Sequence, residues 1–381
     1  MREIKDIIAA YQSAKVAGIQ SVLATVVHVD GSSFRRPSAR MLVQEDGVTT
    51  GAISGGCLEG DALKKALFAL VKNTNTVVTY DTSDEDDAIV GAQLGCNGII
   101  QVLFEPIPDR TITLLSKAVE LDKPCAVVVL FNLEDKNAEQ LGTQLLVEQT
   151  VQGELINRKL QQRLVNDAQS AIASKTSLFR EYVVDKQSQH VFIEYYSPPI
   201  SLVIVGAGND VQGLAIMADT LGWRVTIADG RRTHAKAERF LPTCQIVVAK
   251  PEAIFESIAL TEQTAVVLMT HNYQYDLAVL SYLLSEPEVA YVGILGPKTK
   301  YQLMLSDLAE QGVVPTKQQL ANIYAPIGFE IGAETPEEIA LSVLAEIKAV
   351  MSQANAKGGH LKDKPSPIHA NNNTRFDRLT L

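Results

Sequence analysis

Apolar residues follow two periods along this chain, and together they predict a mixed α/β protein. At the N-terminus the apolar positions within 4–11 recur at helical spacing, which is typical of an amphipathic helix. Elsewhere in the first half, short apolar runs predict strands, of which 21–30 and 125–131 have the pattern of buried ones. These expected strands lie at 21–30, 39–44, 48–53, 76–80, 99–106 and 125–131.

The most informative pattern is a strand, a glycine turn, a helix and a second strand. The apolar run 202–205 meets a turn that contains Gly206 and Gly208, and a helical pattern over 211–221 follows. The second strand ends in Asp229, at the position where an acidic side chain usually holds a ribose hydroxyl. The pattern predicts a Rossmann-type half, in which helix-start amides can receive phosphate.

The same alternation continues to about residue 350 and sets the expected domain boundaries. Further parallel-sheet strands are expected at 244–249, 265–270 and 291–295, with helices around 251–259, 274–285 and 299–311. Thr335 and Glu338 form a capping-box pattern, which predicts the start of one more helix. We therefore expect an N-terminal mixed α/β domain at 1–196, a C-terminal Rossmann-like parallel-sheet domain at 200–350, and a polar, flexible tail at 351–381. The segment 194–199, with two prolines, is the expected linker.

Two residues depart from the dinucleotide-binding fingerprint. Val211 stands where the third glycine would be, and Asp210 places a carboxylate where a pyrophosphate would arrive. These departures argue against ordinary NAD binding. A Rossmann fold that binds no dinucleotide remains an open alternative.

Composition narrows the function further. Lys and Arg total 34 against 44 for Asp and Glu, a net charge of −10, so a nucleic-acid binder is not expected. The apolar runs are too short to span a bilayer, and the N-terminus does not resemble a signal peptide, so we expect a cytoplasmic protein with no membrane partner. The four cysteines form no C-x-x-C pair, which disfavours a cysteine zinc site.

Cys57 lies between the glycine pair Gly55-Gly56 and the start of a predicted helix. A helix N-terminus favours a thiolate, so Cys57 is a candidate functional thiol. A small residue packed in a tight turn is the alternative interpretation. Cys125 and Cys244 begin apolar runs and are expected in the core, whereas Cys96 lies in a small-residue loop and is a second candidate thiol.

Several segments together resemble one family, the xanthine dehydrogenase accessory protein (XdhC/CoxI) family. They run in order across both expected domains: SSFRRPSARMLV (32–43), GAISGGCLEGDAL (51–63), LGCNGIIQVLFEP (94–106), VIVGAGND (203–210), WRVTIADGR (223–231), VGILGPKTK (292–300) and PIGFEIGAETPEEIALSVLAEI (326–347). Two positions depart from the family pattern, because Ser38 and Asn97 stand where glycine is common.

The resemblance implies an accessory factor rather than an enzyme. Such a factor binds the molybdenum cofactor (molybdopterin), holds it while a cysteine desulfurase supplies sulfur, and delivers it to an apo-molybdenum hydroxylase of the xanthine dehydrogenase type. The cysteine that matches Cys57 belongs to the family's cofactor loop. The hydroxylase served, the nucleotide form of the cofactor and the oligomeric state stay open, and a homodimer is one option.

The chemistry of such a cofactor selects candidate side chains. Thiolate suits a soft metal, so Cys57 is the candidate molybdenum contact, and Cys96 is either a second thiol or a residue that fits its loop. An anionic pterin needs cationic and amide donors. The cofactor-binding candidates are Arg35, Arg36, Arg40, Gly55, Gly56, Cys57, Gly206, Gly208, Asp229, Arg231 and His271.

Two other functions remain as alternatives. An NAD(P)-dependent oxidoreductase would use the same Rossmann half, but the sequence offers no evident catalytic acid–base pair beside it. A protein with the family fold could also bind a different nucleotide-like ligand or act as a scaffold. We favour the cofactor carrier over both.

Overall fold

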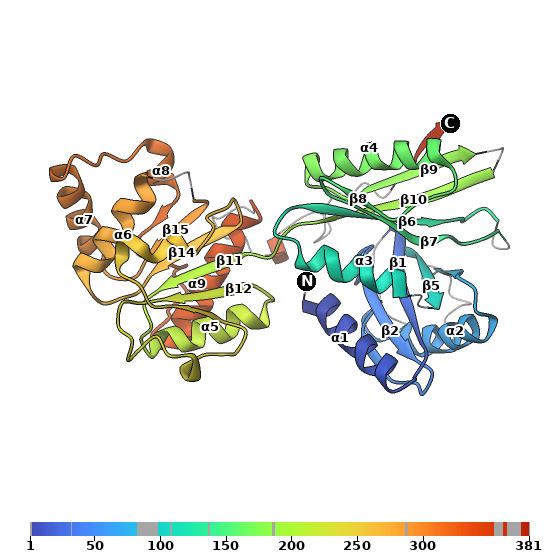
Figure 1. The fold of residues 1–381 in the computed structure, drawn as a ribbon, viewed down its shortest axis with the longest axis horizontal. Helices are drawn as coiled ribbons and strands as arrows, with labels where there is room; N and C mark the ends of the chain where they lie inside the picture. The colour runs from blue at the N-terminus through green and yellow to red at the C-terminus, as the bar shows by residue number, and fades with distance from the viewer. Residues whose placement is uncertain are drawn as a thin grey trace. The chain divides into compact units, whose positions relative to one another are not determined.

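A computed structural model describes most of the chain and divides it into two compact units (Figure 1). Unit 1 comprises Met1–Pro198 and Lys364–Leu381, and unit 2 comprises Pro199–Asp363. The residues described are 2–31, 33–81, 98–106, 109–135, 138–184, 187–285, 289–353, 361–363 and 375–380.

Unit 1 contains an antiparallel sheet, sheet A, with the strand order β3-β2-β1-β5-β4. Its central strand β1 pairs with β2 on one side and with β5 on the other. The first nine residues of β1 are buried, as expected of its continuous apolar run. The strands are β1 (Ser21–Gly31), β2 (Arg40–Gln44), β3 (Thr49–Gly51), β4 (Thr76–Asp81) and β5 (Gly98–Pro106).

A second sheet in unit 1, sheet B, has the order β17-β9-β10-β6-β7-β8. Its edge strand β17 comes from the end of the chain and pairs in parallel with β9, while the other neighbours are antiparallel. We expected this last segment to belong to a flexible tail, and the pairing of β17 was not foreseen. The strands are β6 (Cys125–Phe131), β7 (Gly142–Val147), β8 (Val151–Gln152), β9 (Leu178–Val184), β10 (Gln187–Tyr196) and β17 (Asp377–Thr380).

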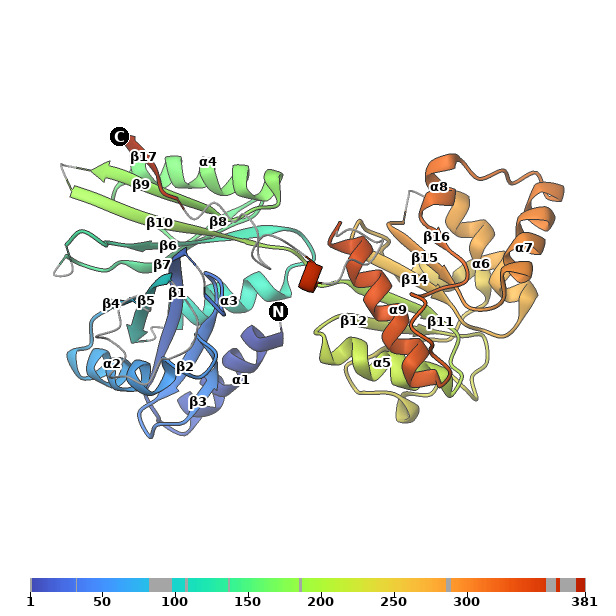
Figure 2. The same cartoon turned by 180° about the vertical axis from the view of Figure 1, so that it is seen from behind.

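Helices complete the layers of unit 1 (Figure 2). Helix α2 packs on one face of sheet A. Helices α1 and α3 share a core with apolar residues of both sheets, and α4 covers the other face of sheet B. The helices are α1 (Arg2–Val16), α2 (Glu59–Lys72), α3 (Asp109–Glu120) and α4 (Arg158–Ser174).

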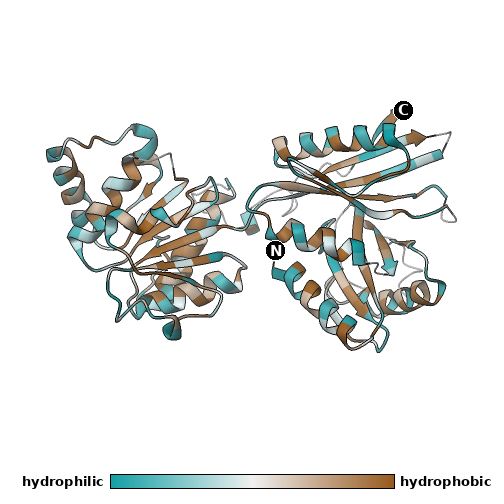
Figure 3. Ribbon diagram, in the orientation of Figure 1, coloured by the Kyte–Doolittle hydropathy of each residue, from teal (hydrophilic) through white to brown (hydrophobic). Residues whose placement is uncertain are grey.

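Unit 2 is built on a parallel sheet, sheet C, with the order β13-β12-β11-β14-β15-β16. In order of appearance the strands therefore lie 3-2-1-4-5-6, which is the arrangement of the Rossmann fold. The central strands β11 and β14 are buried along almost their whole length, and the strands of this sheet are largely apolar, as the brown colour in Figure 3 shows. They are β11 (Ser201–Val205), β12 (Arg224–Ala228), β13 (Gln245–Val247), β14 (Thr264–Leu268), β15 (Tyr291–Ile294) and β16 (Ile323–Tyr324).

Helices cover both faces of sheet C. Helices α5 and α9 share one apolar core with it, and α6 and α7 share another. Helix α9 begins with the expected capping box, in which Thr335 accepts from the Glu338 amide and Glu338 accepts from the Thr335 amide. The helices are α5 (Asp210–Thr220), α6 (Tyr273–Ser285), α7 (Lys298–Glu310), α8 (Lys317–Ala321) and α9 (Pro336–Met351).

The predicted fold class is confirmed, and two local predictions are corrected. The helix expected at 251–259 is a 3-10 helix over Pro251–Glu256, which still packs Ile254 and Phe255 into the core of unit 2. Residues 194–196, expected in the linker, are the end of β10, where Glu194 and Tyr196 are buried. The prolines at 198 and 199 follow this strand and lie where the two units divide.

Candidate functional site

The loop between β3 and α2 holds Cys57 in a defined position. The Ser54 hydroxyl accepts from the amides of Gly56 and Leu58, at 3.2 and 3.1 Å, and lies 3.4 Å from Cys57 Sγ. Ser54 itself donates to Glu59 on the first turn of α2. Cys57 is half-buried, and it packs against the edge of the apolar core that α2 shares with sheet A.

Glu59 anchors this loop as a carboxylate. Burial alone would raise the pKa of Glu59, but the hydrogen bonds from the Ser54 hydroxyl and amide outweigh it and hold the pKa below its usual value. Gly56 has φ of 109°, in the region that favours glycine. The loop geometry therefore depends on Ser54, Gly56 and Glu59, and of these the sequence analysis singled out only Gly56.

A second loop, which carries Phe34, Arg35 and Arg36, lies beside the Cys57 loop. A Cβ placed on Gly55 would lie 3.5 Å from Phe34 Cγ. Glu3 on α1 connects the same two loops, because it accepts from the Ala52 amide and from Arg35 Nη1, both at 3.1 Å. The structure thus brings the predicted thiol loop and the predicted arginine loop together.

This arginine loop forms one wall of a pocket of about 500 Å³ in unit 1. Its floor includes the end of β10, with the half-buried Tyr195. The lining residues are Glu3, Ile4, Phe34, Arg35, Arg36, Ser38, Ala39, Glu194, Tyr195, Tyr196 and Ser197. Two guanidinium groups, aromatic rings and two carboxylates thus line one concave surface, and Cys57 is not among the lining residues. Glu3 is paired with Arg35, and Glu194 with Arg40. The guanidinium groups and the rings are the parts of this surface that could contact a flat anionic ligand.

Arg40, a predicted anion-binding residue, is instead buried between the two sheets of unit 1. Its Nη2 lies 2.5 Å from Glu194 Oε2 on β10, and its Nη1 donates to Glu194 Oε1 and to the Tyr196 hydroxyl. Burial would lower the pKa of Arg40, but Glu194 raises it above its usual range, so the pair is ionic. Because its guanidinium is turned inward and used by Glu194, we do not keep Arg40 in the candidate site.

The remaining cysteines occupy different surroundings. Cys125 is fully buried at the start of β6, where burial raises the pKa of its thiol to about 12, as expected of a core residue. Cys244 is partly buried, and burial raises the pKa of its thiol too. Cys96 and Asn97 lie outside the described residues.

In unit 2 the glycine turn is occupied by the protein's own groups. The Gly206 amide donates to the Ala228 carbonyl at 2.7 Å, and the Ala207 amide donates to Asp229 Oδ2 at 2.9 Å. Gly206 has φ of 129° and leaves no room for a side chain against the Met269 carbonyl. A side chain at Gly208 would collide with the Asp210 carboxylate. We expected the amides of Gly206 and Gly208 to donate to a ligand phosphate. We leave both glycines out of the candidate site, because the Gly206 amide already has a partner in the protein and the Asp210 carboxylate lies against Gly208.

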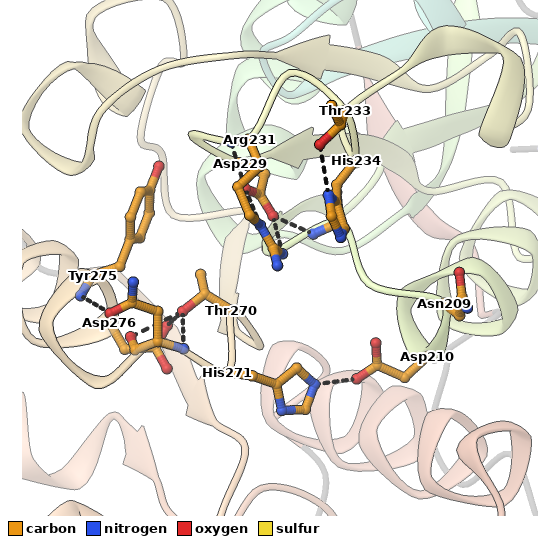
Figure 4. A network of polar contacts seen from close by, with 12 residues as sticks. Asn209, Asp210, Asp229, Arg231, Thr233, His234, Thr270, His271, Tyr275 and Asp276 are labelled. Carbon is orange, nitrogen blue, oxygen red and sulfur yellow. Dashed lines mark hydrogen bonds and ion pairs between the residues drawn. The ribbon is translucent and has the colours of Figure 1, made fainter.

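The other candidates of unit 2 form two hydrogen-bonded pairs, which Figure 4 shows apart from one another. Asp229 accepts from Arg231 Nε and Nη2, at 3.0 and 2.7 Å. Burial would raise the pKa of Asp229, but these hydrogen bonds hold it below its usual value. His271 Nε2 lies 2.9 Å from Asp210 Oδ2.

Metal-ligating clusters and membrane-spanning helices are both absent from the described residues. In the part of the chain that the structure describes, no three His, Cys, Asp or Glu side chains gather as they would around a metal ion. Among the helices of the described residues, none combines the length and the apolar character that a bilayer span requires.

Comparison with known proteins agrees with this architecture. The model of the XdhC Rossmann domain matches residues 202–347, and the model of the XdhC and CoxI family matches residues 15–81. A Bacillus subtilis protein named as a probable subunit of xanthine dehydrogenase is 31% identical over 86% of this chain and 92% of its own length. The chain belongs to the XdhC and CoxI family.

Two further proteins are similar to this chain over most of its length. The Escherichia coli protein named molybdenum cofactor insertion chaperone PaoD is 26% identical over 88% of this chain and 85% of its own. A crystal structure described as a xanthine dehydrogenase from Bacillus halodurans matches with a TM-score of 0.72 and 29% identity. That match covers 94% of this chain and 98% of the solved one, so the fold is shared across both units.

Proposed function

We propose that this protein carries the molybdenum cofactor during maturation of a molybdenum hydroxylase of the xanthine dehydrogenase type. Its relatives support a role in maturation, since one of them is named as a chaperone that inserts this cofactor and another as part of a xanthine dehydrogenase. In this role the cofactor is cargo, which is bound and then released.

The observation that carries the proposal is the position of the Cys57 loop against the arginine loop. A half-buried thiol stands at the start of α2, and the neighbouring loop brings Arg35 and Arg36 to a pocket with Tyr195. A molybdopterin has a soft metal–sulfur end, a flat pterin and an anionic phosphate. Thiolate, aromatic rings and guanidinium groups are the matching partners of these parts.

In this proposal each group has one task. Cys57 contacts the molybdenum or its sulfur ligands, while Arg35 and Arg36 hold the phosphate. Tyr195 and Phe34 flank the pterin ring, and Gly55 and Gly56 let the backbone approach it. Asp229, Arg231 and His271 of unit 2 belong to a separate pocket.

The finer steps follow from the same proposal. The bound cofactor accepts its terminal sulfur from a cysteine desulfurase and then passes to the apo-hydroxylase. We place this work in the cytoplasm, where thiols remain reduced. A homodimer would let two copies of the chain present two cofactors. Light scattering of the purified protein measures its oligomeric state.

An NAD(P)-dependent oxidoreductase is the second candidate. The strand order of sheet C favours it, because that order builds dinucleotide sites. Two carboxylates at the glycine turn count against it, since Asp229 takes the Ala207 amide and Asp210 covers Gly208. The carrier is therefore the better supported function.

The experiment that separates the two functions is cofactor analysis of the natively purified protein. The chain is produced in a host that makes molybdenum cofactor, and the bound pterin is oxidised to its fluorescent derivative and measured per chain. The carrier predicts a substantial pterin content and no nicotinamide. Bound nicotinamide with turnover of a simple substrate, and no pterin, would establish the oxidoreductase instead.

A further inference from the structure

Residues 375–380, the tail segment, lie at the outer edge of sheet B, where β17 runs along β9 (Figure 2). On its other side β9 pairs with β10, and the remaining strands of sheet B pair with one another without β17. The tail segment follows the whole of unit 2 in the chain, although it packs on unit 1. Contacts, and not a hairpin, therefore hold it against β9.

The pairing of β17 with β9 has a register that matches opposite charges. Asp377 lies opposite Arg180 and forms an ion pair with it. Arg378 lies opposite Glu181, with its Nε 3.3 Å from Glu181 Oε1. A slip of one residue would set Asp377 against Glu181. A slip the other way would set Arg378 against Arg180, so either slip places like charges side by side.

Phe376, which precedes this strand, anchors the tail segment. Its ring stacks on His28 at a centroid distance of 4.6 Å and meets His190 edge-on at 4.9 Å. The rings of Phe131 and Phe179 lie 6.3 and 5.8 Å away. These four side chains come from β1, β6, β9 and β10, so the Phe376 ring packs against the core between the two sheets of unit 1.

A backbone ladder with one aromatic anchor is the pattern by which proteins bind extended peptides through strand addition. The ladder of β17 is four residues long. The side chains of Asp377 and Arg378 are 60% and 66% exposed, so their ion pairs set the register but add little affinity. The tail segment thus has the length and the features of a bound peptide ligand.

We propose that the edge of β9 is a peptide-binding site and that the tail segment is its built-in ligand. A partner protein binds there through an extended segment in which an aromatic residue, an acid and a base follow one another. That segment displaces the tail segment and pairs with the N–H and C=O groups of the β9 edge. The proposal does not depend on the role of Cys57.

A synthetic peptide with the tail sequence, RFDRLT with blocked ends, stands in for such a partner. The peptide carries a fluorescent label, and its anisotropy is measured with the full chain. F376A removes the anchor of the built-in segment, and D377R/R378D sets like charges in its register. We expect the peptide to bind each variant about tenfold or more tightly than the wild type, because the built-in segment then competes less. F68A, which truncates an exposed phenylalanine of α2 in the same unit, should bind it as the wild type does.

Two altered peptides and a second readout test how the peptide is recognised. On the F376A chain, peptides that carry either F376A or D377R/R378D should bind about fivefold or more weakly than the tail peptide. Hydrogen exchange is measured for the amides of residues 178–184. These amides should exchange faster in the F376A and D377R/R378D chains than in the wild type, and the tail peptide should protect them again.

Three results would overturn the proposal. They are no binding of the tail peptide to either variant chain at millimolar concentration, equal binding of the altered peptides, and wild-type exchange rates along β9 in both variant chains. D377R/R378D changes only exposed side chains, so the test stands even if F376A fails to fold. Pterin content does not enter this experiment, so failure here leaves the carrier function standing, and failure of the carrier leaves this site standing.

Discussion

The guanidinium of Arg40 on β2 lies 2.5 Å from the carboxylate of Glu194 on β10, and this ion pair joins sheet A to sheet B inside unit 1. Both side chains are nearly or fully buried. Removing one partner of such a pair leaves an unpaired charge in the interior. The stability lost in this way is much larger than the net stability that the intact pair contributes.

Replacement of Arg40 by Met should therefore destabilise unit 1 severely. We expect a loss of about 3–5 kcal/mol in the free energy of unfolding, measured by urea denaturation. The control is R158M, which breaks the exposed pair of Arg158 with Glu154 and should cost less than about 1 kcal/mol. The double variant R40M/E194L should recover part of the loss, and a double variant worse than R40M would contradict this account.

Ser38 adopts φ of 86°, in the left-handed region where side chains are strained. Its amide donates to the Val26 carbonyl at 2.8 Å, which fixes this conformation. The strain gives a physical reason for the glycine that the family resemblance led us to expect at this position. We expect S38G to raise the free energy of unfolding by about 0.5–1 kcal/mol, as measured by thermal denaturation. If S38G does not raise the free energy of unfolding and the pocket stays intact, then contacts of the serine side chain offset the strain of its backbone.

The arginine loop gives a prediction about cargo binding. The double variant R35A/R36A should lower the retained pterin per chain about tenfold, because it removes two candidate phosphate donors. The double variant R158A/R163A serves as the matched control, since it also removes two arginines, both exposed on α4 of the same unit. Equal loss in both variants would mean that net charge alone, and not this loop, determines retention.

His190 should make the stability of unit 1 depend on pH. Burial lowers the pKa of His190 below its ordinary 6.5, and its ring packs against Phe131 and Phe376. Because the unfolded chain binds the proton more readily, the stability that neutral His190 contributes is present above pH 6.5 and is lost as pH falls below it.

Urea denaturation at pH 7.5 and pH 5.5 checks this linkage, since most carboxylates stay charged over that interval. H190Q should flatten the pH dependence, because Gln can still accept the hydrogen bond that the Leu133 amide donates to His190 Nδ1. H234Q, which makes the same substitution in a loop of unit 2, is the control for the loss of a histidine as such. If the free energy of unfolding of H190Q changes with pH as much as that of the wild type, then groups other than His190 cause the pH dependence.

Local patterns predicted much of this fold. The apolar runs at 21–30 and 202–205 became buried strands, and the capping box at Thr335 starts α9, because propensity and burial act over a few neighbouring residues. The parallel pairing of the strands in sheet C also follows from the alternation of strands and helices.

Pairings between distant residues could not be predicted in this way. Arg40 and Glu194 are 154 positions apart, and only the packing of two sheets brings them together. The same holds for β17, which adds the end of the chain to the edge of sheet B. At the candidate site, the sequence placed Cys57 at the start of a helix, but it could not reveal that Ser54 holds the loop or that Phe34 lies against Gly55.

The central claim is that the Cys57 thiol contacts the cargo, and one measurement tests it most directly. Molybdenum and pterin are measured per chain in natively purified wild-type protein, C57A and C244A, with the unfolding curve of each variant as a check on folding. The account predicts that C57A unfolds like the wild type but loses most of its molybdenum, whereas C244A, which alters a partly buried cysteine of unit 2, retains the wild-type amount. Wild-type molybdenum and pterin in a folded C57A protein would contradict it.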